Sequence, residues 1–79
     1  MYSYGIIFYS YDLDDEICVI FTADNYFFAV NKVKDIELTG YAKSDVTYID
    51  DRNKSYYTVT LEELKQHPSY MEKIIEKEK

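Results

Sequence analysis

Two apolar segments, 4–11 and 16–22, flank an acidic tetrapeptide at 12–15, and this arrangement constrains the fold more than any other feature of the chain. Both segments are rich in β-branched and aromatic residues, which favour strands. Asp tolerates turn geometry and hydrogen-bonds its own backbone, so the tetrapeptide predicts a turn between the two strands. Each strand is apolar on both alternating faces, which is typical of a strand buried on two sides or covered on one side by a second subunit.

The residues after this hairpin predict further strands. A turn at 23–25 and an aromatic segment at 26–30 predict a third strand, which makes residues 4–30 an antiparallel meander. The weaker pattern downstream predicts three short strands and one polar hairpin loop, namely the strands 36–39, 46–49 and 56–59 and the loop 50–54.

The C-terminal part of the chain predicts helix. Residues 60–63 match a capping box, in which the Thr60 hydroxyl accepts the backbone N–H of Glu63 and the Glu63 side chain reaches back. Pro68 interrupts the segment, since proline inside a helix costs about 3 kcal/mol. A second capping pattern at 69–72 and an amphipathic stripe predict that the helix resumes; the stripe is Tyr70, Met71, Ile74 and Ile75.

These patterns together predict one α+β domain over residues 1–79. Its strands span about 4–59 and form a five- or six-stranded antiparallel sheet of meander type, followed by a short helical segment at about 61–77. A chain of 79 residues buries only roughly 60–65% of its unfolded surface, so the core is small. Its ten tyrosines exceed what such a core absorbs, which predicts that some of them form a contact surface.

Residues for catalysis are scarce. The chain has one cysteine and one histidine, Cys18 and His67, so it offers no convincing nucleophile and base pair. Cys18 lies in the most apolar segment, which predicts a small, buried, unreactive thiol. One cysteine forms no internal disulfide. A chain this small seldom encloses a substrate pocket, so we expect a protein that is not an enzyme.

Metal and cofactor motifs are also missing from the sequence. Zinc prefers Cys and His ligands, of which there is one each. The alternating acids from Asp12 to Glu16 resemble the start of a calcium loop, but Ile17 stands where the loop needs glycine and Ala23 where it needs glutamate. Two glycines are too few for a phosphate-binding fingerprint. We therefore expect neither a metal nor a cofactor.

The negative charge of the chain is concentrated near its start. The net charge is −6, and residues 1–30 carry five acids and no Lys or Arg. This balance argues against direct binding of nucleic acid or anionic lipid. The N-terminus lacks the basic region of a signal peptide, and no stretch resembles a membrane span, so we expect a cytoplasmic protein.

Surface residues are therefore the candidates for function. The predicted partner-binding residues are the five acids and the two tyrosines beside the turn: Asp12, Asp14, Asp15, Glu16, Asp24, Tyr9 and Tyr11. One hypothesis is an acidic protein whose carboxylates stand where DNA phosphates would, and which occludes the basic surface of a nucleic-acid-binding protein. The alternative is a binder that uses a tyrosine and apolar surface; a third possibility is an accessory subunit of a larger complex.

The small size, the acidity, the tyrosine content and the lack of a catalytic constellation make this chain resemble the small host-takeover proteins that bacteriophages express early in infection. Several of those proteins resemble DNA in charge and block host DNA-binding proteins, including nucleoid-associated proteins such as HU and components of RNA polymerase. Others bind the division or replication machinery. The resemblance is one of composition over the whole chain, so it implies an inhibitor in the host cytoplasm and no particular site residues.

The two apolar strands also predict self-association. A single predicted helix is too little to cover strands that are apolar on both faces, so we expect a homodimer through 4–11 and 16–22. A two-fold dimer would double the acidic surface available to a basic partner.

Overall fold

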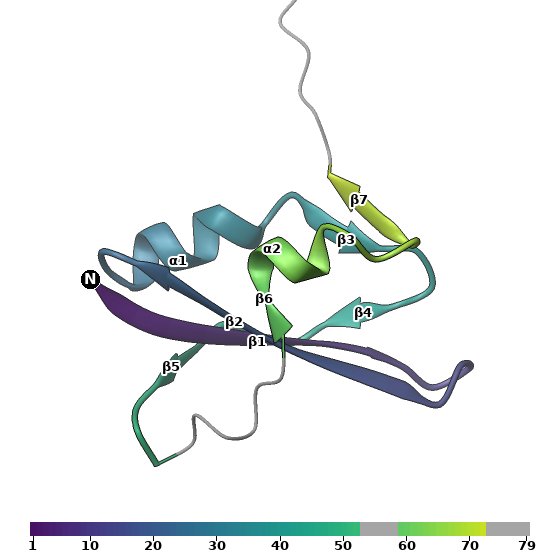
Figure 1. Cartoon of the computed structure of the whole chain (residues 1–79), viewed down its shortest axis with the longest axis horizontal. Helices are drawn as coiled ribbons and strands as arrows, with labels where there is room; N and C mark the ends of the chain where they lie inside the picture. The colour runs from purple at the N-terminus through teal and green to yellow at the C-terminus, as the bar shows by residue number, and fades with distance from the viewer. Residues whose placement is uncertain (53–58, 73–79) are drawn as a thin grey trace, which may run out of the picture.

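The predicted hairpin is confirmed and is the longest feature of the fold (Figure 1). The computed structural model describes residues 1–52 and 59–72. β1 (Tyr2–Ser10) pairs antiparallel with β2 (Asp15–Ala23), with Tyr2 opposite Ala23 at one end and Ser10 opposite Asp15 at the other. Asp14 in the connecting turn has a φ of +53°, a left-handed conformation that Asp tolerates better than most residues. The Ser10 hydroxyl accepts the N–H of Leu13 at 3.1 Å and braces the turn.

The two faces of the hairpin differ in burial. The inner face carries side chains such as Ile6, Phe8 and Val19, which are almost fully buried. The outer face carries Ile7 and Cys18, which lie opposite one another and are only half-buried. The predicted burial on two sides does not occur within one copy of the chain, because the apolar side chains of the outer face are only half-buried; cover by a second subunit stays a prediction.

Two strands join the β1 edge of the hairpin and one joins the β2 edge. β4 (Ala42–Lys43) and β5 (Thr47–Ile49) both pair antiparallel with β1, near its two ends. β6 (Val59–Thr60) pairs with β2 and runs parallel to it. The five-stranded sheet is therefore mixed, and the prediction of a purely antiparallel sheet is wrong. The sequence predicts that strands 46–49 and 56–59 pair with each other across the loop 50–54. Instead, β5 and β6 lie on opposite edges of the hairpin, so Val59 does not pair with β5. Residues 56–58 lie outside the described residues.

The predicted third strand at 26–30 is wrong, because these residues begin the helix α1 (Tyr26–Val33). Asn25 caps this helix, and its side chain accepts the N–H of Phe28 at 3.0 Å. Ala29 and Val33, four residues apart, are buried against the hairpin. A short apolar run is compatible with either a strand or a helix. Here the Asn25 cap and the burial of residues i and i+4 on one face favour the helix. Residues 4–30 therefore form a hairpin and a helix instead of a meander.

The C-terminal prediction is correct at its start and wrong after Pro68. α2 (Leu61–Leu64) carries the predicted capping box: Thr60 N–H donates to Glu63 Oε1 at 2.9 Å, and Glu63 N–H donates to Thr60 Oγ1 at 3.2 Å. β7 (Tyr70–Glu72) replaces the predicted second helix and pairs with β3 (Ile36–Leu38) in a separate two-stranded sheet. Pro68 prevents the chain from continuing as a helix. Pairing with β3 instead supplies hydrogen-bond partners for the backbone N–H and C=O groups that follow. Ile74, Ile75 and the rest of the predicted segment to 77 lie outside the described residues.

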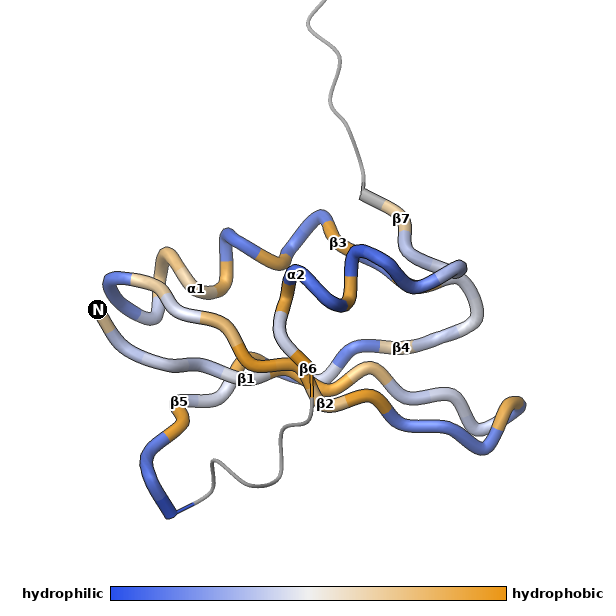
Figure 2. Tube along the Cα trace, viewed as in Figure 1, coloured by the Kyte–Doolittle hydropathy of each residue, from blue (hydrophilic) through white to orange (hydrophobic). Residues whose placement is uncertain are grey.

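The elements form two layers. α1, α2 and the β3–β7 sheet lie on one side of the hairpin, and the core between the layers is centred on Phe8, Val19 and Leu38 (Figure 1). Apolar residues gather where the hairpin passes beneath the helices, and hydrophilic residues gather toward its closed end (Figure 2). Among the described residues, neither helix has the length and apolarity that crossing a membrane requires.

The cap of α1 yields a prediction for stability. Replacing Asn25→Ala removes the acceptor for the Phe28 N–H and should lower the free energy of unfolding by about 1 kcal/mol. Urea denaturation measures this change. Asn25→Ser keeps a side-chain acceptor and should stay close to the wild type; an equal loss in both variants would contradict the role of the cap.

Candidate functional site

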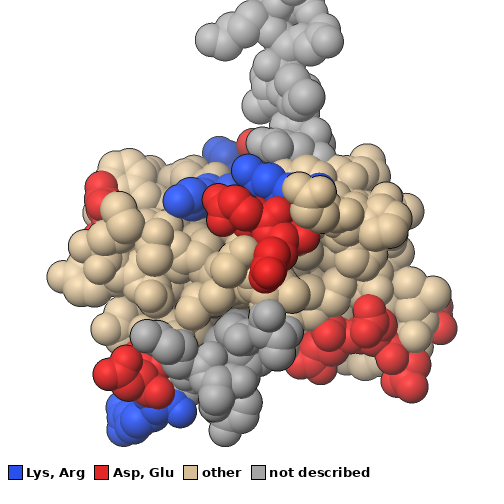
Figure 3. Space-filling view, in the orientation of Figure 1, with Lys and Arg blue, Asp and Glu red and all other residues tan. Residues whose placement is uncertain are grey.

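Four of the predicted partner-binding acids lie together at the closed end of the hairpin. Asp12, Asp14, Asp15 and Glu16 are all exposed there, and we call this group the acidic end. Figure 3 shows Asp and Glu atoms gathered over this part of the molecule with no Lys or Arg atom beside them on that face. Among residues 1–52 and 59–72, the ion pair within 4.0 Å joins Arg52 to Asp50, and none involves the acidic end. These four carboxylates therefore present their charge to solvent without a neutralising cation.

The fifth predicted acid, Asp24, lies at the opposite end of the hairpin. Asp24 follows Ala23, which pairs with Tyr2, whereas Asp15 pairs with Ser10. At about 3.3 Å per residue, this register separates Asp24 from the acidic end by about 25–30 Å. The structure thus brings together four of the five predicted acids.

The two predicted tyrosines lie beside the acidic end. The rings of Tyr9 and Tyr11 meet edge to face with centroids 5.7 Å apart. Tyr9 lies opposite Glu16 in the hairpin and is half-buried, whereas Tyr11 is 91% exposed. With Ser10 and three of the acids, the two tyrosines line a shallow hollow of about 280 Å³. Tyrosine and carboxylate groups therefore form one continuous surface.

Tyr41 and His67 belong to the same surface, although the sequence does not indicate them. The Tyr41 hydroxyl donates a hydrogen bond to Asp15 Oδ2, and the Tyr41 ring meets the His67 ring edge to face at 6.0 Å. His67 Nδ1 accepts the N–H of Ser69 at 3.1 Å, which orients the imidazole. Gly40, with a φ of +88°, turns the chain between β3 and β4 and so carries Tyr41 to Asp15. No spacing in the sequence signals a contact across 26 residues.

A groove of about 380 Å³ adjoins the acidic end between β2 and α2. Apolar side chains, polar groups and two carboxylates line it: Ile17, Val59, Leu64, Gln66, His67, Asp15 and Glu63. Such a lining suits a side chain with an aliphatic stem and a cationic head, which is the chemistry of Lys and Arg.

The groups that could support catalysis lie apart. Cys18 belongs to the outer face of the hairpin, whereas Ile17 of the same strand lines the groove that contains His67, so thiol and imidazole are on opposite faces of the sheet. Burial raises the pKa of the Cys18 thiol, and the nearby charge of Glu16, whose Oε2 lies 3.7 Å from Sγ, raises this pKa further. The described residues contain no group of three or more His, Cys, Asp or Glu side chains placed to hold a metal ion.

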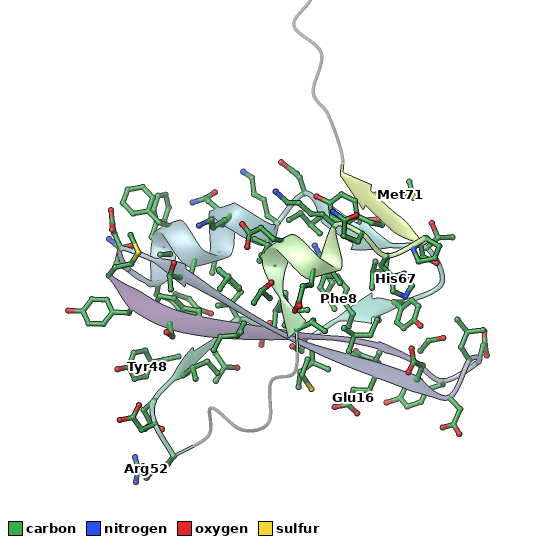
Figure 4. All side chains as sticks on the ribbon, in the orientation of Figure 1. Phe8, Glu16, Tyr48, Arg52, His67 and Met71 are labelled. Carbon is green, nitrogen blue, oxygen red and sulfur yellow. The ribbon has the colours of Figure 1, made fainter. Side chains whose placement is uncertain are left out.

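A second surface, which the sequence analysis did not locate, lies at the opposite end of the hairpin. We call it the aromatic end, and its exposed side chains are Met1, Tyr2, Tyr26, Phe27, Phe28 and Tyr48. The buried ring of Tyr4 connects several of them, since it lies 6.2 Å from the Tyr26 ring and 6.0 Å from the Tyr48 ring. Figure 4 shows Tyr48 and Glu16 over opposite halves of the hairpin. Phe27 and Phe28 escape prediction because a strand would have buried one of the two.

No protein-family model, curated protein or solved structure matches this chain.

The Tyr41–Asp15 hydrogen bond predicts a pH dependence. This bond, followed by burial, raises the pKa of the Tyr41 hydroxyl above its ordinary value of about 10. The folded protein then retains a proton that the unfolded chain releases, so the free energy of unfolding should fall as pH rises beyond about 10. Tyr41→Phe cannot ionise and should make this fall shallower in urea denaturation series. Tyr11→Phe, which changes an exposed ring without this bond, should leave the slope as in the wild type; equal slopes in all three proteins would refute the assignment.

The surroundings of Cys18 predict slow thiol chemistry. Because its pKa is raised, the thiol should react with iodoacetamide at pH 8 several-fold more slowly in the folded protein than in urea. Glu16→Gln removes the nearby charge and should accelerate the reaction of the folded protein. Asp12→Asn removes a charge elsewhere in the acidic end and serves as the control. A folded rate equal to the rate in urea would contradict this account.

Proposed function

We propose that this chain is a non-enzymatic inhibitor that binds another protein, placing its acidic end on the basic surface of a nucleic-acid-binding partner. One observation carries the proposal: four exposed carboxylates, at Asp12, Asp14, Asp15 and Glu16, gather at the end of a hairpin, and none of them forms an ion pair with a Lys or Arg among the described residues. A bound partner that supplied Lys or Arg side chains would provide the missing counter-charge. Such a partner gives up contact with nucleic acid, because the same basic groups hold phosphates.

The number of carboxylates in the acidic end limits how much of a basic surface it can cover. Duplex DNA carries one charge per about 1.7 Å of axis, so four carboxylates replace only a few phosphates. The inhibitor would therefore occlude one basic patch, such as a loop or arm, instead of a long groove. Asp24 is too far away to take part in the same contact. A single copy acts on a local feature of the partner.

The groove between β2 and α2 supports the same class of partner. Its apolar lining would contact the stem of a long side chain, while Asp15 and Glu63 line the same groove where a cationic head would reach. Asp15 accepts the Tyr41 hydroxyl with Oδ2, which fixes the carboxylate in place. We infer that one Lys or Arg of the partner enters this groove when the acidic end is docked.

The resemblance to phage host-takeover proteins also suggests where the chain would act. In that setting the chain acts in the cytoplasm of a bacterial host, and nucleoid-associated proteins such as HU are the first partners to test. Association would be fast at low salt and would weaken steeply as ionic strength rises, because it depends on exposed charges.

A charge-neutralised variant tests the proposal. The triple variant Asp12→Asn, Asp14→Asn, Glu16→Gln removes three charges, and Asn at position 14 tolerates the left-handed backbone. It leaves Asp15 in its bond with Tyr41. The matched control, Asp24→Asn, Glu37→Gln, Asp45→Asn, removes three charges from exposed residues away from the acidic end.

Each protein is tagged, incubated with nuclease-treated bacterial lysate and eluted with a salt gradient, and the eluted proteins are identified by mass spectrometry. The wild type and the control should release basic DNA-binding proteins as salt rises, and the test variant should capture at least tenfold less of them. Added duplex DNA should compete with capture. Equal capture by both variants, or partners that are not basic and stay bound at high salt, would overturn the proposal and favour the aromatic end as the binding surface.

A further inference from the structure

The aromatic end exposes five aromatic rings to water. Phe27 is 68% exposed, and Phe28 and Tyr26 are each 52% exposed. Tyr2 and Tyr48 are exposed to a similar degree and pack edge to face at 6.3 Å. Large contiguous apolar patches on soluble proteins mark interaction surfaces. Aromatic rings are the side chains most enriched at the centres of such surfaces.

The apolar area is sufficient for a modest dimer. A fully buried Phe or Tyr contributes roughly 150–250 Å² of surface, so five rings exposed by half to two-thirds offer on the order of 600 Å². Two copies that cover each other would bury on the order of 1,200 Å², which is the lower bound of stable specific interfaces. Interfaces at this lower bound are typical of weak association.

The charges of the molecule favour a second copy at this end. Beside the aromatic end, Asp24 and Lys32 line the hollow that also contains Met1 and Phe28, so the local charge is balanced. The Lys32 ammonium donates to the Thr22 carbonyl at 2.9 Å and is held there. The acidic end lies about 25–30 Å away, several Debye lengths at physiological salt. Two copies that meet at their aromatic ends therefore keep their excess negative charge far apart.

We propose that the aromatic end is the surface through which two copies of this chain form a two-fold dimer. The sequence predicts a dimer through the strands 4–11 and 16–22, but the apolar side chains Ile7 and Cys18 on their outer face are already partly buried. The most exposed ring of the aromatic end, Phe27 at 68%, lies on α1, and Tyr48 lies on β5; both are outside those strands. The dimer presents its two acidic ends outward, at opposite extremes. This proposal rests on the aromatic end alone and does not require the function proposed for the acidic end.

Analytical ultracentrifugation of the purified full chain from about 1 to 200 µM tests the proposal. The wild type should shift from its monomer mass of 9.4 kDa to twice that mass within this range. The double variant Phe27→Gln, Phe28→Gln keeps good helix formers in α1 and should weaken dimerisation at least tenfold. The matched control, Tyr11→Gln, Leu13→Gln, removes exposed apolar side chains from the opposite end of the hairpin and should dimerise as the wild type does.

Circular dichroism first establishes that each variant is folded. If the α1 variant does not fold, the same sedimentation experiment is made with a second variant at the same surface, Tyr2→Gln, Tyr48→Gln. Dimerisation should change less than twofold between 0.05 and 0.5 M NaCl, since apolar contacts are not screened. A wild type that is monomeric at 200 µM would overturn the proposal. So would a dimer that survives both aromatic-end variants, or one that only the Tyr11 and Leu13 control disrupts.

Discussion

The antiparallel ladder between β1 and β2 is the constraint on which the rest of this structure depends. The three other strands of the five-stranded sheet attach to one of these two strands, and the inner face of the pair supplies Phe8 and Val19 to the core. The helices and the small β3–β7 sheet lie on that inner face. The hairpin is long for so small a domain, so its two ends reach beyond the middle of the core. One end carries the acidic side chains and the other carries the exposed aromatic side chains.

Local signals predicted the elements that depend on neighbouring residues. The β1–β2 hairpin and the Thr60–Glu63 capping box are both present, because each is decided within a few residues of chain. The sequence does not predict α1, because the aromatic residues at 26–30 favour a strand more strongly than the Asn25 cap favours a helix. In the fold, the burial of Ala29 and Val33 on one helix face stabilises the helix despite this strand propensity. β7 was missed because its partner, β3, lies more than thirty residues away.

The candidate site divides in the same way. The four acids at 12–16 were predictable, since one turn holds them together. Tyr41 and His67 were not, because only the packed sheet brings them to Asp15. The sequence predicts Asp24 as part of the acidic group, but the length of the strands separates it from the turn. The acidic and the aromatic side chains thus lie at opposite ends of one hairpin, so the two proposed contacts would not compete for the same surface.

Ser44 closes part of the edge that β1 would otherwise offer to a strand of another molecule. Between β4 and β5, its hydroxyl accepts the Ile7 N–H at 2.9 Å and its own N–H donates to the Ile7 carbonyl at 2.8 Å. The edge of β1 is thereby closed between its two short partners. Among the described residues, the outer edge of β2 has only the two-residue β6 as a partner, and Asp15 and Glu16 stand at its start. Repulsion between these carboxylates would oppose strand-to-strand pairing of neighbouring molecules at this edge, which is one way in which proteins with exposed sheet edges avoid aggregation.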